Sequence, residues 1–333
     1  MATVKVSSLV VYQYSIPWVW PGHIPSPFPK RREGLILQLN SSPGHQGFGE
    51  VAPLPGFSRE NLASVKRQVF SIKKDVEGKK IPRNLKELSE YFFARFDKLS
   101  LHPSVQFGLE TALLNLTANI QGKLFCELIS DSYRDSISLN ALLDGTQGDV
   151  CRSVRKKIKQ GFHSFKLKVG RGQLSQDIKK VQALEKILGT SASLRLDANQ
   201  LWDWETAVNF GKKINPHIID YIEEPLKDCR RLSNFYHETG IPFALDESLL
   251  NNRPEKLRKQ RGLKAIILKP TLLGGIMRTM SFMRKAESFG VQPIISSSFE
   301  TDIGLTALSG LAACARDDLP VGLDTRITTT PEV

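Results

Sequence analysis

Long apolar runs are missing from this chain of 333 residues. A membrane-spanning helix needs about 18 or more consecutive apolar residues, and no segment reaches that length. The first residues also have no apolar core ahead of a cleavage site, so no secretory signal is expected. We therefore expect a cytoplasmic protein.

Paired cysteines and glycine-rich phosphate motifs are also missing. The four cysteines are far apart and form no CxxC pair, which argues against a zinc cluster or a disulfide framework. No dinucleotide or P-loop motif follows any expected strand. With 41% hydrophobic and 24% charged residues, the composition is that of an ordinary folded protein.

Acidic residues are fewer than basic ones. The chain has 46 Lys and Arg against 34 Asp and Glu, a net charge of +12. Such a balance can indicate a nucleic-acid partner, but the basic residues are spread over amphipathic helical patterns and are densest at 256–264. No zinc-finger, RRM or helix-turn-helix signature accompanies them. We expect a small-molecule partner, with no nucleic acid and no membrane, and keep nucleic-acid binding as the less favoured alternative.

The first hundred residues predict a small α+β unit. Val4–Tyr14 and Gly34–Asn40 have the apolar pattern of strands, with a Pro/Trp-rich loop between them. Trp18 and Trp20 on that loop are candidates for closing over a site. A second loop is expected at 47–56, ahead of helical patterns that continue to about residue 99.

From Pro103 onward, strand and helix patterns alternate. A strong helical pattern covers 106–120, and others lie between the apolar runs that follow. These runs cover 137–142, 164–169, 193–196, 218–222, 242–245, 265–268 and 293–295, with a weak eighth at 321–323. Such alternation is typical of a parallel sheet with crossover helices, and eight units predict a (β/α)8 TIM-like barrel. We expect a capping domain at 1–102, the barrel at 103–325 and a C-terminal tail at 326–333.

Charged residues end five successive strands of the expected barrel. They are Lys166 and Lys168, Asp197, Glu223, Asp246 and Lys269. From Lys168 onward, each member of this set lies about one strand–helix unit further along the sequence than the one before it. Because all strands of a barrel are parallel, these groups should meet at the C-terminal face, where barrel enzymes build their active sites. A catalytically inactive barrel that serves only as a scaffold would not need this set of charges.

The residue types indicate metal-assisted proton abstraction. Three carboxylates without histidine or thiolate suit Mg²⁺ or Mn²⁺ rather than zinc. Lys166 and Lys168 share one face of a strand, and their mutual repulsion with partial burial should lower an ammonium pKa. A low-pKa lysine facing a metal-bound carboxylate can remove the proton α to that carboxylate.

In this order, the motifs resemble the enolase superfamily, in its muconate-lactonizing-enzyme-like subgroup. They are Lys166-Leu167-Lys168, Asp197-Ala198-Asn199, Ile222-Glu223-Glu224-Pro225, Leu245-Asp246-Glu247-Ser248 and Leu268-Lys269-Pro270. The resemblance covers essentially the whole chain, including a capping domain. It implies that Asp197, Glu223 and Asp246 bind Mg²⁺, with Glu223 rather than Glu224 as the ligand. It also implies that Asn199 and Glu247 support the ligands through hydrogen bonds.

Within the subgroup the sequence is most similar to the o-succinylbenzoate synthase family. The supporting segments are 194–199, 269–275, 295–300 and 322–325. Members of that family dehydrate a succinyl-hydroxycyclohexadiene carboxylate to o-succinylbenzoate in menaquinone or phylloquinone biosynthesis. The resemblance implies that Lys168 is the base, that Lys269 stabilises the enediolate and that Lys166 keeps the pKa of the base low. The implied substrate contacts are Ser296, Ser298 and Arg195.

The same lysines and metal can serve other reactions, so three alternatives from this superfamily stay open. They are dipeptide epimerases, N-acylamino acid racemases and muconate cycloisomerases. A dipeptide epimerase is expected to have Asp-x-Asp on the eighth strand, whereas this chain has Asp324-Thr325-Arg326 there. A racemase with a histidine base on the seventh strand is disfavoured, since 291–300 contains no histidine.

Overall fold

The computed structural model describes residues 3–17, 30–42 and 44–325, and its first part is a four-stranded antiparallel sheet in the order β3-β2-β1-β4. The elements are β1 Thr3–Pro17, β2 Arg31–Ser41, β3 Gln46–Val51, α1 Leu62–Val76, β4 Lys80–Pro82, α2 Leu85–Phe96, the 3₁₀ helix η1 Asp97–Leu99 and α3 Pro103–Gln121. On β2, the alternate residues Leu35, Leu37 and Leu39 are fully buried, as expected for a sheet with one face covered. The two strands predicted from the apolar pattern are confirmed as β1 and β2.

The predicted loop at the start of 47–56 is wrong, because residues 46–51 form strand β3. The two glycines that read as loop residues permit close packing instead. A Cβ atom on Gly49 would overlap the carbonyl oxygen of Gly108 in α3, and one on Gly47 would overlap that of Ala112. Glycine in this strand therefore marks a close backbone approach of helix to sheet.

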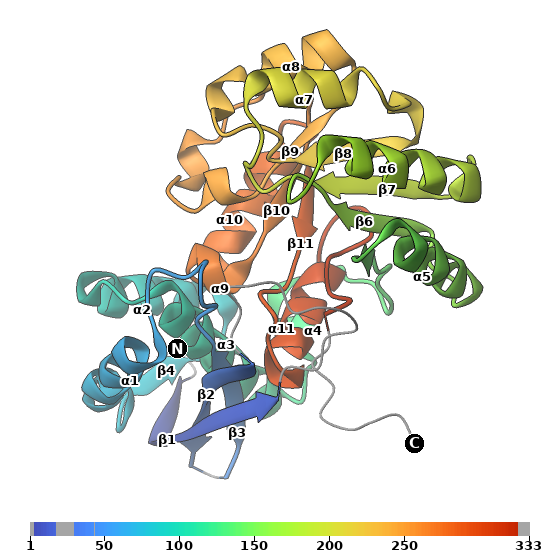
Figure 1. Cartoon of the computed structure of the whole chain (residues 1–333). Helices are drawn as coiled ribbons and strands as arrows, with labels where there is room; N and C mark the ends of the chain where they lie inside the picture. Colours follow the sequence, from blue (N-terminus) through green and yellow to red (C-terminus); the bar gives the residue numbers. More distant parts are fainter. Residues whose placement is uncertain (1–2, 18–29, 43, 326–333) are drawn as a thin grey trace.

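The second part is a seven-stranded parallel sheet in the order β11-β10-β9-β8-β7-β6-β5, curled as Figure 1 shows. The strands are β5 Ala141–Leu143, β6 Ser164–Lys168, β7 Ser193–Asp197, β8 Ile219–Glu223, β9 Phe243–Leu245, β10 Leu263–Leu268 and β11 Gln292–Ile295. The helices are α4 Phe125–Ile129, α5 Gln147–Lys159, α6 Leu174–Leu188, α7 Trp204–Gly211, α8 Leu232–Thr239, α9 Pro270–Leu273, α10 Ile276–Glu287 and α11 Asp302–Ala313. Short 3₁₀ helices are η2 Pro216–Ile218, η3 Cys229–Arg231, η4 Glu247–Leu249 and η5 Pro254–Lys256.

The weak eighth strand closes this sheet. Val321 forms a parallel bridge with Leu139, which precedes β5, and Gly322 forms one with Ser296, which follows β11. The two bridges join the sheet edges, so the predicted barrel with an α+β cap is confirmed. Its eighth strand is reduced to two residues.

Helix α3 lies between the two parts, packed on β2 and β3 of the cap and on α9 and α10 of the barrel. It is 19 residues long and buried over most of its length. Even so, neither α3 nor any other helix in the described ranges has the length and apolar content needed to cross a membrane.

Two carboxylates of the N-terminal part cap helices of the barrel. Helices α10 and α11 have no side-chain cap of their own. Glu110 on α3 accepts the Met277 N–H at 2.9 Å, at the start of α10. Glu50 on β3 accepts the N–H of Thr301 at 3.0 Å and that of Gly304 at 2.9 Å, at the start of α11. These bonds satisfy amides that a helix start leaves without an acceptor, and they fasten the cap to the barrel.

Candidate active site

The charged residues expected at the strand ends lie side by side at one face of the barrel. Lys168, Asp197 and Glu223 are the last residues of β6, β7 and β8. The strand register pairs Lys168 with Asp197 and Asp197 with Glu223. Asp246 and Lys269 directly follow β9 and β10, and they form an ion pair with each other.

Two lysines share the carboxylate of Asp197. Its Oδ2 atom lies 2.9 Å from Lys166 Nζ and 3.0 Å from Lys168 Nζ. Lys166 also contacts Glu223. The carboxylate side chains are 1–2% exposed and the two lysine side chains 14% and 21%. Charges buried this deeply need opposite charges in contact, and the strand ends supply them.

Burial and charge act on the lysines in opposite directions. Desolvation disfavours the ammonium form of Lys166 and Lys269, but neighbouring carboxylates outweigh it and hold the pKa of both above the usual lysine value. For Lys168 burial prevails, with added repulsion from the neighbouring cations, and its pKa falls below the ordinary 10.5. Of the three, Lys168 is the lysine that most readily gives up its proton.

The carboxylates differ in the same way. Burial raises the pKa of Glu223 to about 7, against the opposing charge of Lys166. Burial also acts on Asp197, but Lys166 and Lys168 outweigh it and keep the pKa of Asp197 well below its usual value. The neighbouring ammonium groups therefore offset the burial of the Asp197 carboxylate, but they do not offset the burial of the Glu223 carboxylate.

The donor set fits a hard divalent cation. Asp197, Glu223 and Asp246 offer carboxylate oxygens only, the ligands that Mg²⁺ prefers. Within the ranges described, no three Asp, Glu, His or Cys side chains surround a common metal position, and ammonium groups lie against all three carboxylates. The deficit of positive charge at Glu223 is what a divalent cation would supply.

Asn199 connects the candidate base to Glu247, a half-buried glutamate. Its Oδ1 accepts a hydrogen bond from Lys168 Nζ at 2.9 Å, and its Nδ2 donates to Glu247 Oε1 at 2.9 Å. The Asn199 N–H donates to Asp197 Oδ1 at 3.1 Å, and its backbone is left-handed, with φ of 44°. Asn199 and Glu247 are thus placed to orient the lysine and its carboxylate partner.

Glu224 faces away from this site. Its Oε1 accepts the N–H groups of Asp246 and Ser248, each at 2.8 Å, and the residue is fully buried. It holds the turn after β9 in place. This arrangement favours Glu223 over Glu224 as the ligand, as the resemblance implied.

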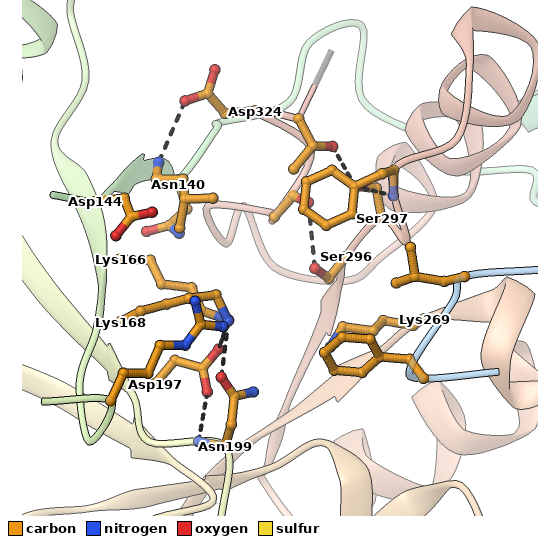
Figure 2. A pocket seen from close by; sticks show the side chains of 17 residues that line it. Asn140, Asp144, Lys166, Lys168, Asp197, Asn199, Lys269, Ser296, Ser297 and Asp324 are labelled. Atoms are coloured by element: carbon orange, nitrogen blue, oxygen red, sulfur yellow. Dashed lines mark hydrogen bonds and ion pairs between the residues drawn. The ribbon is translucent and has the colours of Figure 1, made fainter. Parts of the chain in front are cut away.

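A pocket opens over these groups, and Figure 2 shows Lys166 and Lys168 on one side with Lys269 on the other. It is lined by Leu54, Phe57, Asn140, Leu142, Asp144, Lys166, Lys168, Arg171, Asp197, Asn199, Lys269, Ser296, Ser297, Phe299, Gly322, Asp324 and Thr325. Charged groups line the floor, and apolar side chains from the cap contribute to the wall. Such a pocket suits an anionic molecule with an apolar body.

Arg195, an implied substrate contact, lies outside this lining. It points into the barrel two residues before Asp197, where it donates to Asp220 Oδ2 at 3.0 Å and to the carbonyl of Pro320 at 2.5 Å. Its guanidinium lies 5.0 Å from the centre of the Tyr221 ring. Arg195 therefore fills the barrel interior below the pocket.

Ser296 lines the pocket as expected, but Ser298 does not. Ser298 is 1% exposed, and the neighbouring Ser297 lines the pocket in its place, with its hydroxyl in contact with Thr325. Strand β11 ends at Ile295, so the alternation of side chains that would pair 296 with 298 no longer applies.

Several lining residues escape sequence reasoning. Leu54, Phe57 and Phe299 come from loops, where no periodicity signals a contact. Arg171, three residues after Lys168, could have been found from its place in the loop that follows a barrel strand. Trp18 and Trp20, expected to close over the site, lie outside the described residues.

Comparisons with known proteins agree with the motifs. Residues 149–325 match a family model described as enolase C-terminal domain-like, and residues 6–116 match the MenC N-terminal domain. The chain is 33% identical over 323 residues to o-succinylbenzoate synthase of Pasteurella multocida (strain Pm70), covering 95% of this chain and 88% of that protein. It is 35% identical over 297 residues to Protein PHYLLO, chloroplastic, of Arabidopsis thaliana, covering 83% of this chain but only 17% of that protein.

Among solved structures, the L-Ala-D/L-Glu epimerase from Bacillus subtilis has a similar fold. Its TM-score is 0.85 at 24% identity, with 96% of this chain and 90% of that chain covered. At this level of identity the likeness concerns the fold alone.

Proposed function

Because this chain belongs to the o-succinylbenzoate synthase family of the enolase superfamily, we propose that its pocket dehydrates 2-succinyl-6-hydroxy-2,4-cyclohexadiene-1-carboxylate to o-succinylbenzoate, as a hydro-lyase of menaquinone biosynthesis. The observation that carries the proposal is the placement of Lys168 and Lys269 on opposite sides of one pocket. One lysine can take a proton while the other stabilises the negative charge that results.

Lys168 is the base in this proposal. Its lowered pKa makes the neutral amine available, and Asn199 Oδ1 orients it at 2.9 Å. The amine takes the proton α to the ring carboxylate, and the resulting ammonium returns that proton to the hydroxyl leaving from the neighbouring ring carbon. Both transfers use one nitrogen, so they occur on one face of the ring and release one water molecule. The new double bond completes an aromatic ring, which drives the reaction.

Lys269 and Lys166 act as fixed charges. The raised pKa of Lys269 keeps it protonated, so it stabilises the enediolate charge that develops when the α proton leaves. Lys166 adds like charge beside Lys168 and so lowers its pKa. When bound by Asp197, Glu223 and Asp246, Mg²⁺ (or Mn²⁺) would supply Lewis-acid stabilisation of the same charge.

The substrate has a second carboxylate at the end of its succinyl arm. Arg171 lines the pocket, and no ion-pair partner for it occurs among the described residues, so we assign it to this carboxylate. The Ser296 hydroxyl is a further candidate for the same arm. Asp324 also lines the pocket, and the ammonium of Lys157 lies 2.5 Å from it and offsets its charge.

The epimerase alternative is less well supported by these residues. A free amino group in the substrate would need acidic partners beside the eighth strand, and Asp324 there is already paired with Lys157. A cytoplasmic location and a small-molecule partner stay predictions from the sequence.

An ultraviolet assay with the cyclohexadiene carboxylate and Mg²⁺ tests the proposal, since absorbance changes as the ring becomes aromatic. We expect turnover by the wild type and its loss in Lys168→Ala and in Lys269→Ala. Lys212→Ala is a matched control, because the Lys212 side chain is 58% exposed and forms a surface ion pair with Glu238 at 3.6 Å. No turnover by folded wild type would move the substrate to the epimerase or racemase branch, tested next by deuterium exchange on dipeptides and N-acylamino acids.

A further inference from the structure

Arg32 on strand β2 is 1% exposed, and its guanidinium bonds to main-chain carbonyls. Nε donates to the carbonyl of Phe299 at 2.8 Å, and the two terminal nitrogens donate to four further carbonyls. These are Glu33 at 3.2 Å, Pro53 at 2.7 Å, Ala52 at 2.7 Å and Ser298 at 3.3 Å. Five bonds match the five N–H groups of a guanidinium, so all its donors are used.

The carbonyls belong to two segments that lie far apart in the sequence. Ala52 and Pro53 follow strand β3 of the cap, whereas Ser298 and Phe299 follow strand β11 of the barrel. Arg32 therefore joins a cap loop and a barrel loop through one rigid side chain.

Each of the two loops contributes apolar side chains to the pocket. Leu54 comes directly after the cap carbonyls and Phe57 three residues later, and Phe299 itself belongs to the barrel loop. All three pack in one cluster with Leu272. The two segments held by Arg32 thus form one apolar wall, which we call the 54–57–299 wall.

The barrel loop needs such an anchor. Phe299 has a φ of 59°, in the left-handed region that a phenylalanine rarely adopts. The turn is held from its other side by Glu300, whose carboxylate accepts the Ser298 N–H at 2.6 Å. Glu50 accepts the N–H of the next residue, Thr301, at 3.0 Å. Arg32 donates to the two carbonyls of this turn, those of Ser298 and Phe299.

We propose that Arg32 is a positioning residue for substrate binding, which holds the 54–57–299 wall against the apolar body of the substrate. The inference rests on the proposed function for the identity of the substrate, a cyclic dicarboxylate with an apolar ring between its charges. Arg32 touches no group of the lysine–carboxylate site, so it acts on binding through the wall and leaves the proton transfers to Lys168.

Arg32→Lys is the sharpest test, because lysine keeps the charge but has three donors on a flexible stem and no planar fork. We expect KM, and the Kd of the product measured by calorimetry, to rise about 10-fold while kcat changes by less than about 3-fold. A purely structural role would lower the amount of folded protein without moving KM. Phe299→Gly provides a second variant, since glycine adopts the left-handed φ without cost and only the ring is lost.

Arg134→Lys is the matched control. Arg134 also donates to main-chain carbonyls, those of Ala315 at 2.6 Å and Ala312 at 3.1 Å, and it does not line the pocket. It should leave KM unchanged. The proposal is overturned if Phe299→Gly leaves KM unchanged, or if Arg32→Lys and Arg134→Lys affect KM alike.

Amide hydrogen exchange tests the anchoring without any substrate. Arg32→Lys should speed exchange in peptides covering 54–58 and 298–301 together, whereas Arg134→Lys should not. If the wild type does not turn over the cyclohexadiene carboxylate, the proposed function fails, but this exchange result still decides whether Arg32 anchors both loops. Unchanged exchange at either loop in Arg32→Lys would refute the anchoring itself.

Discussion

Replacing Glu110 by glutamine is expected to stabilise the protein at neutral and alkaline pH. Glu110 on α3 is 1% exposed, and burial raises its pKa from 4.5 to about 7. Hydrogen bonds from the Met277 N–H at 2.9 Å and from Gln106 at 3.1 Å favour the anion but do not offset the desolvation. Helix α10 starts at this point, and its dipole adds a further attraction of about 0.3–1 kcal/mol for an anion.

The direction in which stability changes with pH follows from which state, native or unfolded, binds the proton of Glu110. Between pH 4.5 and about 7 the native protein keeps a proton on Glu110 that the unfolded chain has released. The stability due to this proton is complete below pH 4.5 and is lost as the pH rises through about 7. At about 1.4 kcal/mol for each pKa unit, the loss amounts to about 3 kcal/mol. Glutamine keeps an acceptor for Met277 and cannot ionise, so it escapes this loss.

Urea unfolding followed by circular dichroism, at several pH values from about 4.5 to 8, measures the difference. We expect the free energy of unfolding of Glu110→Gln to equal that of the wild type at the acid end. At the alkaline end it should be higher than that of the wild type by up to about 3 kcal/mol. Glu205→Gln is the control, because Glu205 is an exposed carboxylate in the first turn of its own helix α7. That variant should stay within about 0.5 kcal/mol of the wild type throughout.

Two results would refute this reasoning. If the curves of Glu110→Gln and wild type run parallel over the whole range, Glu110 does not titrate with a raised pKa. If the variant is less stable at the alkaline end, the helix start stabilises the anion by more than burial costs.

Three further predictions concern the pocket. Lys168→Ala should lower kcat by about 10³-fold with an unchanged circular dichroism spectrum, since a general base contributes about 10²–10⁴-fold, and a near-normal rate would remove it as the base. Excess EDTA should abolish turnover in the ultraviolet assay and Mg²⁺ should restore it; activity that persists in EDTA would exclude the metal role. Asn199→Leu removes an acceptor that favours the ammonium of Lys168, so the acid limb of the kcat–pH profile should move to lower pH. Asn199→Asp should move it the opposite way, and equal profiles would contradict the contact.

The floor of the site could be predicted from the sequence because it depends on a repeated local pattern. Lys168, Asp197 and Glu223 each end an apolar run, and parallel strands bring such ends to one face whatever the details of packing. The register then pairs these residues directly. Strand alternation also predicted correctly that Lys166 points the same way as Lys168, because both contact Asp197.

The wall of the site and the strand β3 could not be predicted in this way. Gly47 and Gly49 read as loop residues because their function, the close approach of α3, lies in another part of the chain. Arg32 alternates along β2 like any exposed residue of a strand, yet its partners at 298 and 299 are more than 260 positions away. Periodicity reports which face a residue occupies and not which distant loop covers that face.

The carboxylate of Glu50 has a consequence for the order of events during synthesis. Glu50 is synthesised early, whereas Thr301 and Gly304, whose amides its carboxylate binds, are added 251 and 254 positions later. Before α11 is synthesised, the Glu50 carboxylate can accept a hydrogen bond from the Tyr14 hydroxyl of the cap but not from these amides. Burial of the anion is then only partly compensated. We therefore expect the cap and the last strand–helix unit to finish folding together, in a step that brings together residues 251 and 254 positions apart. Protection of β3 amides in refolding should accordingly rise in the same phase as that of α11.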